Sequence, residues 1–341
     1  MRKIYFISML LIAAVFIMPI FAVKGEPLIT KSRAISTLRT LSESTYAMAL
    51  SSESQGKSPL APPSSDGGIT VKVQFADGVR ELRLYDYLCG VVSAEMPASF
   101  PPEALKAQAV AARTHTYNRI LAGGESSTHG LADVCTDPAH CKAYAPPGEN
   151  GYPEAVINSV AQTDGLVVLS EDEPILAVFH AASSGKTERA ADVWGGDVPY
   201  LQSVVSDGEE AAPRYRGEVC VTREEFAETI KARYGDADFD KPAADWFSSV
   251  TRSEAGGVIS LEVCGTVITG NVFRSLFGLN STNFEIETDG DNIRLSTTGY
   301  GHGVGMSQYG ARALALEGKS FEEILTWYYT GASVGTFTLE G

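Results

Sequence analysis

Hydrophobic and polar residues alternate with different periods along the chain, and the period of each segment predicts a helix or a strand there. From Ile69, two runs of alternating residues flank Asp77-Gly78, which predicts a β-hairpin. Helical spacing predicts helices at 85–95, 102–121, 152–163, 223–234 and 321–329. Apolar or alternating runs predict strands at 165–170, 175–181, 199–206, 248–269 and 283–298. Because helices and strands mix without strict βαβ alternation, we expect an α+β fold of mixed sheets and helices.

The N-terminal segment predicts a membrane anchor at residues 1–23. Arg2 and Lys3 precede Ile4–Val23, an uncharged run long enough to cross a bilayer as a helix. The basic flank places the N-terminus in the cytoplasm and the rest outside. A cleavable signal peptide is the alternative, but the run is long for one, and the site after Ala22 is weak. We therefore expect a retained transmembrane helix and an extracytoplasmic remainder.

The rest of the chain, from residue 24, divides into two parts of different composition. Residues 24–68 are rich in Ser, Pro and Gly, which predicts a flexible linker. Residues 69–341 carry the periodic patterns and predict one elongated domain with a substrate cleft. Within it, residues 207–245 are acidic and mixed, and we interpret them as a variable elaboration. The net charge of −15 over 341 residues argues against nucleic acid as a partner, because phosphates require a basic surface.

Glu95 is a candidate general acid. It follows an apolar helical run and precedes Met96-Pro97, and a proline disfavours helical backbone at the residue before it. The helix should therefore end near Glu95 and leave its carboxyl group beside apolar neighbours. A carboxyl group in such surroundings can stay protonated near neutral pH, as a general acid must. The alternative is an ordinary solvated glutamate at a helix end.

A loop at residues 122–151 contains a candidate metal site. His129, Cys135, His140 and Cys141 supply two imidazoles and two thiolates, a full tetrahedral set for Zn²⁺. Four protein ligands leave no position for a catalytic water, so such a zinc ion would be structural. The alternative is a Cys135–Cys141 disulfide with two surface histidines. The chain has five cysteines, so at least one stays unpaired.

Two polar, glycine-containing clusters are candidates for ligand contact. The first is FHAASSGKTE, in which Ser184 could be a nucleophile, but a G-x-S-x-G motif is absent and a plain turn is the alternative. The second is GYGHGVGMSQYGA, where four glycines surround His302. Its setting is not that of a dinucleotide site. The hydroxyl and amide groups of both clusters suit a sugar better than an anion.

Several long motifs together resemble the stage II sporulation protein D family. They are GVVSAEMP, ALKAQAVAARTHTY, VFHAASSGKTE, VWGGDVPYLQSV, TGNVFRSLFGLNSTNF, GYGHGVGMSQYGARALA and FEEILTWYYTGA, in order from about residue 69 to the end. The chain departs from the family pattern at His115 and at Ala-Ala-Ser-Ser-Gly, and residues 207–245 match poorly. Members of the family are similar to membrane-anchored lytic transglycosylases that cut denuded peptidoglycan strands in the septum and engulfment zone during sporulation.

The resemblance implies a role for each cluster. Glu95 would be the single catalytic residue, and the four loop ligands would hold one structural Zn²⁺. The partners would be glycan strands and the stage II sporulation proteins P and M, at the mother-cell membrane of the septum. The predicted substrate-binding residues are Arg113, His180, Ser183, Ser184, Gly185, His302, Ser307, Gln308 and Tyr309.

Three alternative functions remain open from the sequence. The family fold also resembles amidase enhancers, which bind glycan and stimulate a partner without catalysis of their own. A zinc amidase would need the metal for turnover. A hydrolase with two carboxylates would give reducing ends in place of 1,6-anhydro ends.

Overall fold

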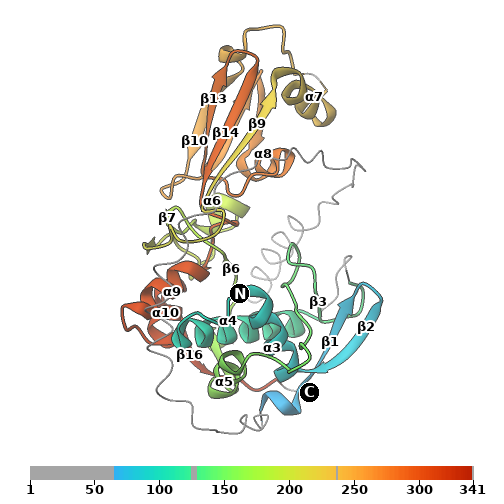
Figure 1. Cartoon of the computed structure of the whole chain (residues 1–341), viewed down its shortest axis with the longest axis vertical. Helices are drawn as coiled ribbons and strands as arrows, with labels where there is room; N and C mark the ends of the chain where they lie inside the picture. The colour runs from blue at the N-terminus through green and yellow to red at the C-terminus, as the bar shows by residue number, and fades with distance from the viewer. Residues whose placement is uncertain (1–64, 124–128, 236, 340–341) are drawn as a thin grey trace.

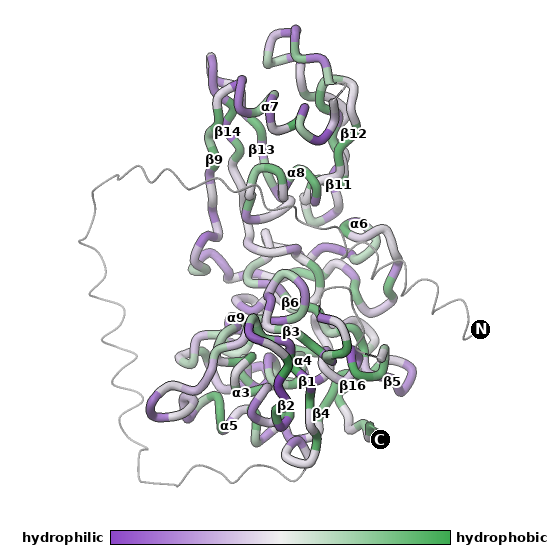
Figure 2. The backbone as a smooth tube through the Cα atoms, turned by 90° about the vertical axis from the view of Figure 1, so that its right-hand side faces the viewer, coloured by the Kyte–Doolittle hydropathy of each residue, from purple (hydrophilic) through white to green (hydrophobic). Residues whose placement is uncertain are grey.

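The computed structural model describes residues 65–123, 129–235 and 237–339, and these residues form two lobes. Each lobe has its own core of buried apolar side chains, one from segments 71–201 and 304–329 and the other from segment 226–295. In Figure 1 the second lobe stands at one end of the long axis and the helices of the first lobe at the other. Figure 2 shows the same outline from the side. The second lobe is therefore an insertion in the sequence of the first.

Helices fill the core of the first lobe. α3 (Leu84–Glu95) ends where the sequence predicts, because Met96 adopts extended backbone ahead of Pro97. α4 (Pro102–Leu121) begins with a proline, whose missing N–H costs nothing in the first turn. Buried alanines along α4 allow close packing by its neighbours. Three further helices pack against it: α5 (Glu154–Gln162), α9 (Gln308–Leu316) and α10 (Phe321–Tyr328).

Small sheets surround these helices. β1 (Thr70–Phe75) and β2 (Gly78–Arg83) form the predicted hairpin, and β3 (Val134–Cys135) runs parallel to β1. The other sheets of this lobe are β5 (Glu173–Pro174), β4 (Leu166–Ser170) and β16 (Ser333–Thr336); β6 (Phe179–His180) with β15 (Met306–Ser307); and β7 (Gly185–Lys186) with β8 (Val205–Ser206). The short helix α6 (Ala190–Trp194) lies near the second lobe (Figure 1).

Two predicted strands are much shorter than their apolar runs. Of residues 175–181 only β6 pairs as a strand, and of residues 199–206 only β8. The Leu176 N–H donates instead to the hydroxyl of Tyr200 at 3.0 Å. The next two N–H groups bond to carbonyls two residues earlier in the chain. An apolar run indicates that a segment is buried, but not that it pairs with another strand. Residues 175–181 are mostly buried, yet they have no neighbouring strand along most of their length.

The second lobe contains two antiparallel sheets of three strands. One has the order β13 (Phe284–Asp289), β14 (Asn292–Thr298), β9 (Arg216–Thr222), and the other β10 (Phe247–Arg252), β11 (Val258–Val263), β12 (Thr266–Thr269). α7 (Arg223–Arg233), η2 (Ala243–Asp245) and α8 (Gly270–Phe277) accompany them. A capping box of Thr222 and Glu225 starts α7. The segment 207–245 thus supplies β9 and α7 to this lobe.

The mixture of helices and sheets confirms the α+β class. The predicted anchor at residues 1–23 and most of the predicted linker lie outside the described residues. The packed structure includes the short helix η1 (Asp66–Gly68), which begins three residues before the expected domain boundary at residue 69. Among the helices that the structure describes, none is long and apolar enough to cross a membrane.

Candidate functional site

Glu95, the last residue of α3, is half-buried, and two donors from distant segments hold its carboxylate. Its Oε1 accepts a hydrogen bond from the backbone N–H of Ala143 at 2.9 Å. Its Oε2 accepts one from the side-chain amide of Gln308 at 3.1 Å. Ala143 belongs to the loop after β3, and Gln308 is the first residue of α9. Glu95 is therefore a partly enclosed, oriented carboxylate and not a fully solvated residue at a helix end.

Gln308 connects Glu95 to α4. Its Nε2 also lies 3.4 Å from Oε1 of Gln108, a residue with no exposed surface. The Nε2 of Gln108 is buried and has no hydrogen-bond partner among the described residues. Most buried donors in proteins are paired, so this amide is an unusual feature beside the candidate acid. Gln308 is among the residues predicted from the sequence, whereas Gln108 is not; its signal in the sequence is a single amide within an alanine-rich, buried helix face.

Lys142 is a second residue of this site that the sequence pattern does not indicate. Its side chain is buried, and its Nζ lies 3.6 Å from the centroid of the Phe179 ring. Burial lowers the pKa of Lys142 to about 8, and the negative charge of Glu95 opposes this shift. A lysine in a polar loop normally indicates solvent exposure, so only its position next to Cys141 could have drawn attention to it. The structure adds a cation to the surroundings of Glu95.

His180 and His302 lie close together, with ring centroids 5.7 Å apart, and both are directed at the backbone. The Nδ1 of His180 donates to the carbonyl of Val304, whereas the Nδ1 of His302 accepts from the N–H of the same residue. Burial lowers the pKa of His180 to about 4 and that of His302 well below its ordinary value. Both rings are therefore neutral near pH 7. The buried Nε2 of His180 has no partner among the described residues.

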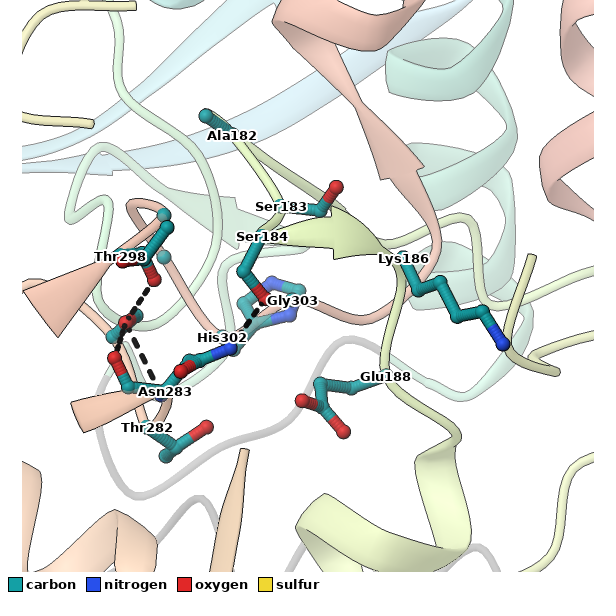
Figure 3. Close-up of a pocket in the computed structure, with 13 residues that line it drawn as sticks. Ala182, Ser183, Ser184, Lys186, Glu188, Thr282, Asn283, Thr298, His302 and Gly303 are labelled. Atoms are coloured by element: carbon teal, nitrogen blue, oxygen red, sulfur yellow. Dashed lines mark hydrogen bonds between the residues drawn. The ribbon is translucent and has the colours of Figure 1, made fainter. Parts of the chain in front are cut away.

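Ser184 and His302 line a small pocket between the two lobes, together with other polar residues (Figure 3). Figure 3 shows the Ser184 hydroxyl pointing toward Asn283, whose Nδ2 donates to it at 2.7 Å. On another side of the pocket, Glu188 accepts from the Gly257 N–H at 3.0 Å. Both contacts join the first lobe to the second. Ser184 thus takes part in the junction of the lobes and not in the contacts around Glu95.

The other residues predicted to bind substrate contact the protein itself and do not contact Glu95. Gly185 lies in β7 with φ +100°, a conformation that favours glycine. The Tyr309 ring packs edge-on against Phe100, with 5.1 Å between the centroids. Ser183 and Ser307 are buried, and each donates to the carboxylate of Glu209. Of the nine predicted substrate-binding residues, the structure gives Gln308 a direct contact with Glu95.

Arg113 corrects one prediction. Its side chain is 0% exposed and forms a 2.6 Å ion pair with Asp66, which is also 0% exposed. The guanidinium donates further to the carbonyls of Val160 and Leu166. The guanidinium is fully paired with these acceptors and has no exposed surface that a glycan could contact. The prediction that Arg113 binds substrate is therefore wrong. The sequence pattern missed this because Asp66 lies in the segment predicted as linker.

The four loop residues form a candidate metal centre. The ligand atoms of His129, Cys135, His140 and Cys141 all lie within 4.8 Å of one another. The Nδ1 of His140 lies 3.4 Å from Sγ of Cys135 and 3.3 Å from Sγ of Cys141, and Nε2 of His129 lies 3.7 Å from the latter sulfur. Metal–ligand bonds of about 2.0–2.3 Å in a tetrahedron place donor atoms about 3.3–3.8 Å apart. The three separations given above fall within this range, so the donor atoms are close to the spacing that a tetrahedral ion requires.

The two cysteines of this centre are separate thiols and not the alternative disulfide. A hydrogen bond from Cys141 lowers the pKa of Cys135 to about 4, and the same contact, together with burial, raises the pKa of Cys141. Cys135 is therefore the cysteine of the pair that forms a thiolate more readily. A thiolate is the form of cysteine that binds a metal.

The chain is similar in sequence to known proteins over the segments that carry the candidate site. The family described as stage II sporulation protein matches residues 74–169, which include Glu95 and the four metal-site residues. The chain is 33% identical to stage II sporulation protein D of Bacillus subtilis (strain 168), over 83% of this chain and 85% of the relative. It is 30% identical to the protein of that name from Bacillus amyloliquefaciens, over 96% and 92%. It is also 26% identical to a Bacillus subtilis amidase enhancer, over 73% of this chain and 40% of that protein.

Proposed function

The chain belongs to the stage II sporulation protein D family, and we propose that it is a lytic transglycosylase of peptidoglycan. It would cut denuded glycan strands between N-acetylmuramic acid and N-acetylglucosamine and leave 1,6-anhydro ends. The observation that carries this proposal is the carboxylate of Glu95, which is half-buried and is oriented by two donors from distant segments. Asp66, Glu188 and Glu209 are buried too, but each is held by structural partners. One carboxyl group suffices for a transglycosylase, whereas an ordinary glycosidase requires two.

In this mechanism Glu95 acts first as an acid and then as a base. The protonated carboxyl group gives its proton to the oxygen of the glycosidic bond, and the bond from that oxygen to C1 of the muramoyl residue breaks. The 6-hydroxyl of the same residue then attacks C1, and the Glu95 carboxylate takes its proton. The new C1–O6 bond closes the 1,6-anhydro ring without consuming water. The N–H of Ala143 and the amide of Gln308 stabilise the carboxylate between the two transfers.

We propose that the His₂Cys₂ centre holds one structural Zn²⁺. Its donor set is one that zinc prefers, and four protein ligands close the coordination shell. Bound zinc would supply folding energy to the loop. Cys141 is two residues from Ala143, which donates to Glu95. His129, Cys135, His140 and Cys141 would therefore keep this donor in place and take no part in proton transfer.

We extend the proposal to the cellular setting. The chain would be anchored by residues 1–23 in the mother-cell membrane at the septum, with both lobes outside the cytoplasm. Its partners there would be peptidoglycan strands and the stage II sporulation proteins P and M. This placement rests on the family and on the sequence of the N-terminal segment.

Product analysis tests the activity. The purified chain alone is incubated with denuded glycan strands and, in parallel, with intact peptidoglycan, and the ends are identified by mass spectrometry. We expect 1,6-anhydromuramoyl ends from the denuded strands. Reducing ends would indicate a hydrolase and would overturn the proposal.

A second candidate function is an enhancer of a cell-wall amidase, favoured by the similarity to the Bacillus subtilis amidase enhancer. This function predicts binding to glycan without any new ends when the chain is alone. It also predicts faster release of stem peptides when an amidase is added. A Glu95→Ala variant would keep that stimulation, because the enhancer needs no proton transfer.

A further inference from the structure

Glu209 is a buried carboxylate to which the proposed mechanism assigns no role. It is 1% exposed and lies in the segment that the sequence predicted as an elaboration. Its Oε2 accepts from the Ser183 N–H and from the Ser307 hydroxyl, each at 2.6 Å. Its Oε1 accepts from the Ser183 hydroxyl at 2.7 Å and from the Ser206 hydroxyl. Three segments far apart in the sequence therefore meet at this carboxylate.

All four contacts are donors, so the ionised carboxylate is the form that fits the arrangement. Burial raises the pKa of Glu209, and the hydrogen bonds from Ser206, Ser307 and Ser183 act against this shift. The donors are neutral, and no ion pair involving Glu209 is found among the described residues. An anion in this position depends on its hydrogen bonds, because an unpaired buried charge is costly.

Ser307 connects Glu209 to the beginning of α9. Its hydroxyl oxygen accepts from the Gly310 N–H at 3.2 Å, and Ser307 is the N-cap of this helix. A Cβ on Gly310 would lie 2.3 Å from the Ser206 hydroxyl and 3.0 Å from Oε1 of Glu209. Glycine therefore permits α9 to approach the carboxylate this closely. The start of the helix is held both by its cap and by close packing.

The residue after Ser307 is Gln308, whose amide donates to Glu95 at 3.1 Å. Ser307 thus stands between two carboxylates: its hydroxyl binds Glu209, and the next side chain binds Glu95. Because Gln308 is the first residue of α9, a shift of the cap moves its amide as well. Catalytic geometry is sensitive to displacements of about 1 Å.

We propose that Glu209 is a positioning residue for Glu95, which fixes Ser307 at the start of α9 and thereby directs the Gln308 amide to the Glu95 carboxylate. The structural part of this proposal stands on the hydrogen bonds alone. Its effect on turnover rests on the proposed function.

The structural part is tested by crystal structures of the full chain and of its Glu209→Gln variant. Glutamine keeps the size of the side chain but removes the charge, and its NH₂ group cannot accept from a serine. We expect the Gln308 Nε2–Glu95 Oε2 distance to increase beyond 3.5 Å. An unchanged contact of about 3.1 Å in the variant would overturn the proposal, whatever the activity of the protein.

The functional part is tested by a double-mutant cycle of Glu209→Gln and Gln308→Ala on denuded glycan. We expect Glu209→Gln to lower kcat roughly tenfold with KM within about twofold of the wild type. In the Gln308→Ala background the same change should have less than about a twofold effect, because the group through which Glu209 acts is gone. Equal effects in both backgrounds would show that Glu209 contributes only to general stability and would overturn the proposal.

Two further variants serve as a control and as a substitute for Glu209→Gln. Tyr328→Phe removes a hydroxyl that binds Ser206 at 2.6 Å and that makes no hydrogen bond to Glu209 or Ser307 among the described residues, so it should keep kcat within about twofold of the wild type. If Glu209→Gln does not fold, Glu209→Asp keeps the charge with a shorter reach and should give a smaller loss in the same cycle. An inactive wild type would contradict the proposed function alone, since the two crystal structures would still decide the positioning role.

Discussion

The backbone N–H of Ala143 donates a 2.9 Å hydrogen bond to Oε1 of Glu95. Ala143 follows Cys141 by two residues, so the candidate metal centre and the candidate acid are connected through a few backbone bonds. The neighbouring Lys142 adds a buried cation to the same surroundings. The loop is therefore part of the setting of Glu95, although in the sequence it is separated from α3 by the whole of α4.

Replacement of Glu95 should abolish the proposed reaction. We expect Glu95→Gln to lower the release of anhydromuramoyl ends by about 10²–10⁴-fold, the contribution of general acid–base catalysis. Glutamine keeps the shape of the side chain but cannot transfer the proton. Mass spectrometry of products from denuded strands measures the effect, with Glu317→Gln on the surface as the control. Release of anhydro ends at the wild-type rate would remove Glu95 from the mechanism.

Metal removal should affect stability and activity together. We expect one zinc ion per chain by elemental analysis, and both chelation and Cys141→Ser should lower the melting temperature and the turnover in parallel. Cys220→Ser, at an exposed cysteine outside the site, is the control and should change neither. Loss of turnover at an unchanged melting temperature would instead support a catalytic metal.

Gly90→Ala should disturb the loop that contacts Glu95. A Cβ at Gly90 would lie 2.2 Å from Cε2 of Tyr144, which forces the ring and its neighbour Ala143 to move. Overpacking of this kind costs about 1–3 kcal/mol of folding free energy. We expect lower stability in urea denaturation together with lower turnover. Gly68→Ala, where a Cβ meets nothing within 4 Å, is the matched control. A Gly90→Ala protein with wild-type turnover would show that the loop tolerates the displacement.

Arg113→Leu should destabilise the first lobe without a specific effect on substrate binding. The change leaves Asp66 buried and unpaired, which costs about 3–5 kcal/mol for a broken buried ion pair. Addition of Asp66→Asn should recover part of the lost free energy of unfolding in urea. KM for glycan, measured on the folded protein, should remain that of the wild type. A raised KM at unchanged stability would return Arg113 to the binding site.

Two histidines with lowered pKa values predict a loss of stability in mild acid. Burial lowers the pKa of His180 to about 4 and that of His302 well below 6.5, with the nearby cations Lys142 and Arg274 contributing to the His302 shift. Below pH 6.5 the unfolded chain therefore binds more protons than the folded one. The free energy of unfolding should fall from pH 6.5 toward pH 4, by up to about 1.4 kcal/mol per pH unit and histidine. His180→Asn should flatten this dependence; an unchanged slope would exclude His180 as its source.

Features that depend on neighbouring residues could be predicted from the sequence. The hairpin at Asp77-Gly78 and the end of α3 at Glu95 follow from turn chemistry and from Pro97, and both occur as predicted. The four metal-site residues lie within a short loop, so their residue types already indicated that they could meet. Backbone preferences and the types of candidate metal ligands depend on residues that are close together in the sequence.

Which distant side chains share one site depends on the fold. Gln308 reaches Glu95 across 213 positions of sequence, and Glu209 reaches Ser307 across 98. A periodic pattern reports burial and element type, but it does not identify the partner of a buried polar group. For this reason Arg113 was predicted as a substrate ligand, while Gln108 and Lys142 were missed. Their roles follow from the path of the chain through two lobes, which brings groups together that no local pattern relates.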